Sequence, residues 1–253
     1  MGDLAKSNCG NASWWHGENY ISVVIPAYNE EKRIGGTIER IHFYLSSREL
    51  QFEILVVDDG SADSTPALVS ELARELENIV LISYRPNRGK GCAVKTGVLA
   101  SRGRFVLVSD ADLSTPIEEA DKLLELCKGR IDVAFGSRAL PDSRVEIEQG
   151  LLRRIMGRIF NLLVRTLALP GVRDTQCGFK CFKGEVARDL FSKQVTEGFA
   201  FDVELLARAV QQGYRIQEVP IHWLNVASST VRPFRDSLKM LRDLLRVKRL
   251  LGI

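Results

Sequence analysis

The sequence predicts an α/β fold in which helices flank a mostly parallel β-sheet, and three observations lead to this prediction. Short apolar runs of strand length alternate with longer segments of helical periodicity. Polar or acidic residues follow several of these runs directly, which is typical of the carboxyl edge of an open parallel sheet. The 253 residues are 45% hydrophobic and 26% charged, which is ordinary for a globular domain.

The first part of the chain alternates strands with helices. The predicted strands span residues 21–26, 52–57, 79–83, 105–109 and 132–136, and the helices between them span 30–47, 64–77, 90–101 and 116–127. Because the strands are almost continuously apolar, both faces of the sheet should be covered. The intervening helices are long enough to be the crossovers that parallel strands require.

The pattern changes after residue 140. Residues 150–169 and 234–251 are predicted to be basic amphipathic helices, 200–211 a further helix, 172–181 a turn leading into a short strand, and 214–223 a strand. Residues 1–19 show no periodicity and are expected to form a flexible tail. We therefore expect one domain at 20–231, followed by a basic amphipathic C-terminal helix at 232–253.

Composition excludes several classes of protein. The five cysteines are scattered and no signal peptide is evident, so we expect reduced thiols in a cytosolic protein. Only three histidines are present and Cys177 and Cys181 have no second pair beside them, which argues against a zinc site. No apolar run approaches the roughly 18 residues that span a bilayer.

The net charge of +3 is unevenly distributed. Residues 150–169 hold four arginines and no acid, and residues 232–253 hold seven basic and two acidic residues, which leaves the rest of the chain net negative. An acidic body with two basic, leucine-rich segments predicts a side that faces a polyanion or an anionic membrane. For the helix at 234–251, simple packing on the domain is the alternative to a position on a membrane surface.

The first motif, Pro26-Ala27-Tyr28-Asn29-Glu30, follows the first predicted strand. Tyr28 could stack on a nucleobase, and Glu30 could accept a hydrogen bond from a ribose hydroxyl or a base. The alternative is a plain strand-to-helix turn, in which Glu30 is favourable in the first turn of the helix.

The next two motifs also follow strands. Asp58 and Asp59 precede Gly60. Capping the next helix would need only one of the acidic residues in this stretch. The Asp58-Asp59 pair is therefore predicted to bind a base or ribose hydroxyls. The run Asn87-Arg88-Gly89-Lys90-Gly91 places two glycines and two cations before a helix, which favours phosphate contact, with a plain turn as the alternative. The spacing of a Walker P-loop is missing.

The motif Asp110-Ala111-Asp112 carries most weight. It follows the apolar strand at 105–109, where a carboxylate is costly unless it is paired or bound to a metal. Two carboxylates one residue apart can share one divalent ion. Mg²⁺ and Mn²⁺ prefer such oxygen ligands and complete their shells with water and substrate phosphates. The alternative is a turn before the helix that follows.

These motifs occur in order, each after a strand, and together they resemble the family 2 glycosyltransferases of the Rossmann-like GT-A fold. Three later segments narrow the resemblance to the branch that glycosylates polyprenyl phosphates: Gly136-Ser137-Arg138, residues 173–180 and residues 201–206. Within that branch the sequence is most similar to the dolichyl-phosphate glucosyltransferases, with the mannose synthases next. The resemblance extends from about Tyr20 to the C-terminus.

The resemblance implies a role for each site residue. The nucleotide would be held by Pro26, Ala27, Tyr28, Glu30, Asp58 or Asp59, Lys90 and Asp110, and the metal, Mg²⁺ or Mn²⁺, by Asp110 and Asp112. The acceptor phosphate would meet Ser137, Arg138 and Arg154. The sugar pocket or its loops would involve Asp174, Gln176, Asp202 and Glu204, and the catalytic residues would be Asp112, Arg138 and Asp202.

The activity implied is an inverting transfer of a hexose, with UDP-glucose as the favoured donor, to an undecaprenyl or dolichyl phosphate. An acceptor phosphate is already anionic, so it needs no strong general base. The enzyme would then work at the cytoplasmic face of an anionic membrane as a peripheral protein, and self-association is left open. Donor alternatives are GDP-mannose and UDP-N-acetylglucosamine.

Three other functions compete with this one. A soluble glycosyltransferase acting on a sugar hydroxyl would need a base, for which Asp202 is available. A sugar nucleotidyltransferase would need an N-terminal glycine-rich phosphate loop, which the sequence lacks. A nucleic-acid binder would use the basic helices, but the acidic body argues against nucleic acid as a partner.

Overall fold

The computed structural model describes residues 20–146, 169–224 and 233–252, with side chains of the last helix described from Arg242 onward. The predicted tail at 1–19, most of the predicted basic helix at 150–169, and Arg154 within it lie outside the described residues.

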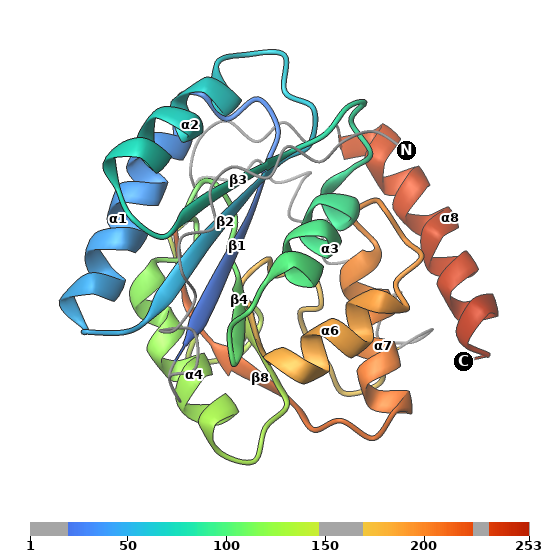
Figure 1. Cartoon of the computed structure of the whole chain (residues 1–253). Helices are drawn as coiled ribbons and strands as arrows, with labels where there is room; N and C mark the ends of the chain where they lie inside the picture. The colour runs from blue at the N-terminus through green and yellow to red at the C-terminus, as the bar shows by residue number, and fades with distance from the viewer. Residues whose placement is uncertain (1–19, 147–168, 225–232, 253) are drawn as a thin grey trace.

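The centre of the molecule is a seven-stranded sheet of order β3-β2-β1-β4-β7-β5-β8 (Figure 1). Six strands are parallel, and β7 alone runs antiparallel to both of its neighbours. The strands are β1 (Ile21–Ala27), β2 (Phe52–Asp58), β3 (Ile79–Ser83), β4 (Phe105–Val108), β5 (Val133–Ser137), β7 (Lys180–Lys183) and β8 (Ile216–Pro220). The α/β fold with a mostly parallel sheet, predicted from the sequence, is confirmed.

Helices cover both faces of the sheet (Figure 1). Alternate residues of each central strand point to opposite faces, so Val23 and Ile25 pack into one apolar core and Val24 into the other. The first core is closed by α1 (Ile34–Ser47), α2 (Thr65–Glu75) and α4 (Ala120–Lys128), which the short helix η1 (Ile117–Glu119) precedes. The second is closed by α3 (Lys90–Ala100), α6 (Gly184–Ser192) and α7 (Phe201–Gln211).

The C-terminal part departs from the prediction in three places. The single strand predicted at 214–223 is divided, because Ile221 turns into the core and separates β8 from β9 (His222–Leu224). β9 pairs with β6 (Arg144–Glu146) in a second, two-stranded sheet that the sequence did not predict. The helix α6 was also not predicted.

The last helix, α8 (Pro233–Leu251), begins one residue before the predicted start and packs on α7. Leu244 and Val247 are buried at this contact, whereas Leu245 and Leu250 are exposed. Gln211 Nε2 donates a hydrogen bond of 2.6 Å to the Leu251 carbonyl oxygen. None of the helices in the described part of the chain has the length and apolarity to span a bilayer.

Candidate active site at the carboxyl edge of the sheet

The loops after β1 and β2 are locked together at the carboxyl edge of the sheet. Ala27 and Asp58 are register partners at the ends of the two parallel strands. The Asn29 backbone N–H donates to Ser61 Oγ at 2.9 Å, and the Asn29 side-chain oxygen accepts from the Ala62 N–H at 2.9 Å. The first two sequence motifs therefore form one continuous surface, and Tyr28 projects from it with an exposed ring.

The Asp58-Asp59 pair is buried and hydrogen-bonded to backbone groups. Asp58 Oδ1 accepts from the Ser61 N–H at 3.0 Å. Asp59 accepts from the backbone N–H groups of Arg88 and Gly89, both at 2.7 Å, and from Asn87 Nδ2 at 2.8 Å. Asp59 thus fixes the loop before α3, and the loop in turn places Lys90 at the start of that helix.

Lys90 faces the carboxylate of Asp110. Its Nζ atom lies 2.5 Å from Asp110 Oδ1, so the third and fourth motifs meet in space. Burial alone would lower the pKa of Lys90, but the negative charges of Asp110 and Asp202 raise it above its ordinary value. Burial would likewise raise the pKa of Asp110, but Lys90 holds it below its ordinary value. Both groups are therefore charged at neutral pH.

Asp112 and Glu30 add two carboxylates to the same region. Asp112 Oδ1 accepts from the Ser114 N–H at 2.9 Å, in a turn where Leu113 has a left-handed φ of 47°. Glu30 forms an ion pair with Arg33 at 2.6 Å. Burial raises the pKa of Glu30, and the nearby charges of Asp112 and Asp110 raise it further.

Arg138 lies beyond the end of β5 and is gripped by Asp174. Its Nε and one terminal nitrogen donate to the two oxygens of Asp174 at 2.7 and 2.9 Å, and its backbone N–H donates to the same carboxylate at 3.1 Å. The guanidinium carbon lies 5.6 Å from the centre of the Trp223 ring. The Arg138 side chain is 32% exposed, so its remaining N–H groups can reach a ligand.

A second, fully buried ion pair lies behind these groups. Lys180 Nζ, at the start of β7, donates to Asp202 Oδ1 at 2.5 Å and also to the Cys177 carbonyl oxygen. Burial raises the pKa of Asp202, and the charge of Lys180 partly offsets that effect. The charge of Asp202 also helps to raise the pKa of Lys90.

Three other residues singled out from the sequence have mainly internal partners. Glu204 is completely buried and accepts from the Val195 and Thr196 N–H groups and from Arg208. Ser137 is also completely buried, and its Oγ accepts from the Ala139 N–H at 3.2 Å. Gln176 Nε2 is buried and finds no hydrogen-bond partner among the described residues.

The structure adds two residues to the site that the sequence analysis did not assign. Gly178 lies against the carboxylate of Asp110. Glu218, on β8, accepts from the backbone N–H groups of Arg173 and Asp174 at 3.0 and 2.7 Å, and so holds the segment that grips Arg138. Gly178 falls within a segment that the sequence had marked, but no pattern in the sequence distinguished Glu218.

The donor set at Asp110 and Asp112 fits one divalent cation. The described residues contain no group of three or more His, Cys, Asp or Glu side chains arranged as a complete metal cage. Magnesium-type ions typically use one or two carboxylates and complete their shell with water and substrate phosphates. Two neighbouring carboxylates beside a lysine at a helix N-terminus are therefore suited to a metal that arrives with a diphosphate.

Comparison with known proteins gives the family. The sequence model described as Glycosyl transferase family 2 matches residues 22–191. The chain is 38% identical to a dolichyl-phosphate beta-glucosyltransferase of Dictyostelium discoideum, over 92% of this chain and 76% of that protein. It is 35% identical to the dolichyl-phosphate beta-glucosyltransferase of Homo sapiens, over 93% of this chain and 76% of that protein.

Solved structures agree on the fold. Glucosyl-3-phosphoglycerate synthase from Mycobacterium tuberculosis, in complex with Mn²⁺, UDP-glucose and phosphoglyceric acid, superposes with a TM-score of 0.68 at 21% identity, covering 93% of this chain and 81% of that one. Mannosyl-3-phosphoglycerate synthase from Rubrobacter xylanophilus gives a TM-score of 0.67 at 21% identity, covering 92% and 75%. From the sequence match and this shared fold together, the chain belongs to glycosyl transferase family 2.

Proposed function

We propose that the enzyme transfers glucose from UDP-glucose to a polyprenyl phosphate of the dolichyl type, with inversion at the anomeric carbon. The observation that carries the proposal is the pairing of two anion-binding groups at one sheet edge. Lys90 Nζ lies 2.5 Å from Oδ1 of Asp110, which follows β4, and Arg138 follows β5 at the same carboxyl edge of the sheet. The relatives named as dolichyl-phosphate glucosyltransferases support the same substrates.

A divalent cation fits the diphosphate end of this site. Asp110 and Asp112 would hold it, and when bound it supplies charge neutralisation to the departing UDP. Lys90 adds a second positive charge at the N-terminus of α3, where backbone N–H groups also favour phosphate. Asp58, Asp59, Glu30 and Tyr28 border the edge where the uridine would lie. The choice between Mg²⁺ and Mn²⁺ belongs to the proposal, and the complex of the M. tuberculosis synthase with Mn²⁺ favours Mn²⁺.

Arg138 is the proposed contact for the acceptor phosphate. The Asp174 carboxylate uses Nε and one terminal nitrogen, and the remaining N–H groups can donate to a phosphate. The fork to Asp174 and the face of Trp223 fix the direction of the guanidinium before the acceptor arrives. Catalysis then depends on positioning two anionic substrates and stabilising the charge that leaves with UDP. Arg154 is a further candidate for this contact, whereas Ser137, predicted for it from the sequence, is completely buried.

The buried Lys180–Asp202 pair bears on the alternative in which a sugar hydroxyl is the acceptor. That reaction needs a general base, and Asp202 was the available carboxylate. In the structure Asp202 is almost fully buried and bonded to Lys180, so it cannot readily accept a proton from a bound hydroxyl. A phosphate acceptor avoids this requirement, which favours the polyprenyl phosphate.

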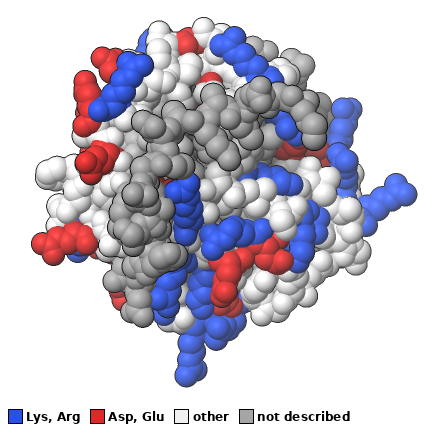
Figure 2. Space-filling view, viewed as in Figure 1, with Lys and Arg blue, Asp and Glu red and all other residues white. Residues whose placement is uncertain are grey.

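The C-terminal helix suggests how the enzyme reaches its acceptor. Leu245 and Leu250 are exposed on α8 together with Arg246 and Arg249, and Figure 2 shows basic side chains on the side of the molecule where α8 lies in Figure 1. Exposed leucines among arginines suit a helix that lies on an anionic membrane. We propose a peripheral position on the cytoplasmic face, where the donor is available. Flotation with anionic vesicles at low salt tests this part, and protein that stays at the bottom of the gradient contradicts it.

A donor screen tests the proposed reaction. The enzyme is incubated with farnesyl monophosphate, Mn²⁺ or Mg²⁺, and UDP-glucose, GDP-mannose or UDP-N-acetylglucosamine in turn, and the lipid product is identified by mass spectrometry. We expect a hexosyl product from UDP-glucose, with the β configuration by NMR. The Asp112→Asn variant should lose at least about a hundredfold in turnover while retaining its thermal unfolding profile. Wild-type turnover by that variant, or product only from another donor, would refute the assignment.

A further inference from the structure

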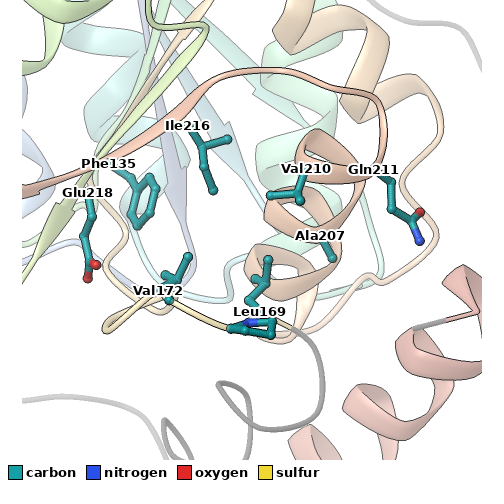
Figure 3. A pocket seen from close by; sticks show the side chains of 10 residues that line it. Phe135, Leu169, Val172, Ala207, Val210, Gln211, Ile216 and Glu218 are labelled. Carbon is teal, nitrogen blue, oxygen red and sulfur yellow. The ribbon is translucent and has the colours of Figure 1, made fainter.

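An apolar groove lies between α7, β8 and the segment that leads to Asp174 (Figure 3). Its volume is about 360 Å³, and Phe135, Leu169, Val172, Ala207, Val210 and Ile216 supply the apolar walls. The groove is open to the surface at Val210, which is 51% exposed although valine is apolar. The candidate active site at Asp110 uses none of these residues, so the groove needs its own explanation.

The groove has one charged residue on its wall, Glu218, and that charge is already satisfied. The two carboxylate oxygens of Glu218 accept from the backbone N–H groups of Arg173 and Asp174 at 3.0 and 2.7 Å. A lipid chain in the groove would therefore meet no free carboxylate. Without these bonds, an unpaired carboxylate on this wall would oppose an apolar ligand.

Glu218 also connects the groove to the residue assigned to the acceptor phosphate. The Asp174 whose N–H it holds is the residue that grips Arg138 through two hydrogen bonds. Hydrogen bonds thus connect Glu218 on the groove wall, through Asp174, to the guanidinium of Arg138. The chain itself gives a second connection, because Phe135 lies on β5 and Arg138 directly follows it. An apolar groove connected in this way to a phosphate-binding arginine has the polarity of an amphiphilic phosphate.

We propose that this groove binds the first isoprene units of the polyprenyl phosphate, those next to the phosphate that Arg138 holds. The inference rests on the proposed function and goes beyond it by assigning the lipid chain to a place on the protein. Its volume lies in the range of small-molecule pockets, about 300–1,000 Å³, which suits a few isoprene units and not the whole chain. A protein partner would need roughly 1,000 Å² or more of buried surface, which favours the lipid.

Photo-crosslinking locates the lipid directly. Wild-type enzyme is irradiated with a farnesyl monophosphate that carries a diazirine on its second isoprene unit, and the labelled peptides are mapped by mass spectrometry. We expect labels within 169–172 and 207–218, reduced by an excess of unlabelled farnesyl monophosphate. Labels confined to 147–168 or to α8 would overturn the proposal and assign the chain to those segments.

Chain-length dependence gives a second, quantitative test. Dimethylallyl, geranyl and farnesyl monophosphate present one, two and three isoprene units on the same phosphate. Because each further isoprene unit buries more apolar surface, the wild-type kcat/KM should rise at least about tenfold from one unit to three. Val210→Trp, which places an indole at the mouth of the groove, should reduce that rise to about threefold or less.

Val80→Asn and Val210→Asn form the matched control pair. Val80 is 41% exposed on β3, at the opposite edge of the sheet from β8. Val210→Asn should weaken the use of farnesyl monophosphate about three- to tenfold without changing UDP affinity, and Val80→Asn should change neither. Equal losses in the two variants would refute the groove.

The proposed function can fail separately from this inference. If no polyprenyl monophosphate accepts sugar from any donor, the proposed function fails, whatever the crosslinks show. If transfer proceeds but rates are independent of chain length and of Val210→Trp, the groove assignment fails while the function stands.

Discussion

Gly178 and the carboxylate of Asp110 are in direct contact: a β-carbon built on Gly178 would lie 2.6 Å from Asp110 Cγ and would overlap the Oδ2 atom. Gly178 lies between the segment that carries Asp174 and the strand β7 that carries Lys180. Because Gly178 has no side chain, the Asp110 carboxylate can occupy the space beside it, at hydrogen-bond distance from Lys90.

Replacing Gly178 by alanine should inactivate the enzyme with little change in its fold. The new methyl group must displace the Asp110 carboxylate, so we expect a loss in kcat/KM of at least about a hundredfold, comparable to the loss of a group that stabilises the transition state. Isothermal titration of Mn²⁺ together with UDP measures the site independently of turnover. Gly36→Ala is the control, because Gly36 in α1 has open space around it and should gain about 0.5–1 kcal/mol of stability. Normal Mn²⁺·UDP binding by Gly178→Ala would contradict this role.

Arg138→Lys should separate acceptor use from nucleotide binding. A lysine cannot reproduce the two parallel bonds to Asp174 and still offer N–H groups to a phosphate. We expect the KM for farnesyl monophosphate to rise at least about tenfold while UDP affinity changes less than about twofold. Arg215→Lys, which alters an exposed pair with Asp132, is the matched control. A parallel loss of UDP affinity would place Arg138 on the nucleotide instead.

Glu204→Gln should loosen the loop that supports the start of α3. Glu204 accepts from two backbone N–H groups at 2.9 and 2.7 Å, and that loop continues to Glu197, whose carbonyl oxygen accepts from the Cys92 N–H at 3.2 Å. Because a buried, charge-assisted network is broken, we expect a loss of about 2–4 kcal/mol in the free energy of unfolding. Urea unfolding measures it. A change below about 0.5 kcal/mol, the size typical of surface substitutions, would show that the network is not needed.

The Arg138–Asp174 pair should make stability depend on acid pH. Burial alone would raise the pKa of Asp174, but the Arg138 guanidinium holds it below its ordinary value. Such a carboxyl contributes stability above its unfolded pKa of about 3.9, and that contribution is lost as the pH falls below this value towards the folded pKa. We therefore expect the free energy of unfolding to decline between about pH 5 and 3, and to decline less in Asp174→Asn. Equal slopes for the two proteins in urea unfolding would exclude this linkage.

The first half of the fold was predictable because its signals are local. Strands such as Ile21–Ala27 and Phe52–Asp58 are buried on both faces, so they appear as nearly continuous apolar runs, interrupted by Ser22 and Glu53, which are hydrogen-bonded to each other. The second half depends on distant partners. The strand Arg144–Glu146 is a strand only because it pairs with His222–Leu224, and no pattern in either segment predicts that pairing.

The site shows the same division. Carboxylates after parallel strands had to meet at one edge, so the proximity of Asp58, Asp110 and Asp112 followed from the fold. The sequence could not tell which acids face a ligand and which hold the protein together. Asp59 and Glu204 carry the same charge as Asp112, yet both accept several internal hydrogen bonds. Only tertiary contacts distinguish these two roles.

The antiparallel strand β7 has a consequence for how the protein forms. β4 is bonded to β1 and β7, and β5 to β7 and β8, so Lys180–Lys183 is the only junction of the seven-stranded sheet between β4 and β5. During synthesis, strands β1 to β4 emerge long before this junction, and until it forms the backbone N–H and C=O groups along one edge of β4 stay unpaired. A truncated product ending before residue 180 would keep that edge open, and its expected fate is aggregation or proteolysis.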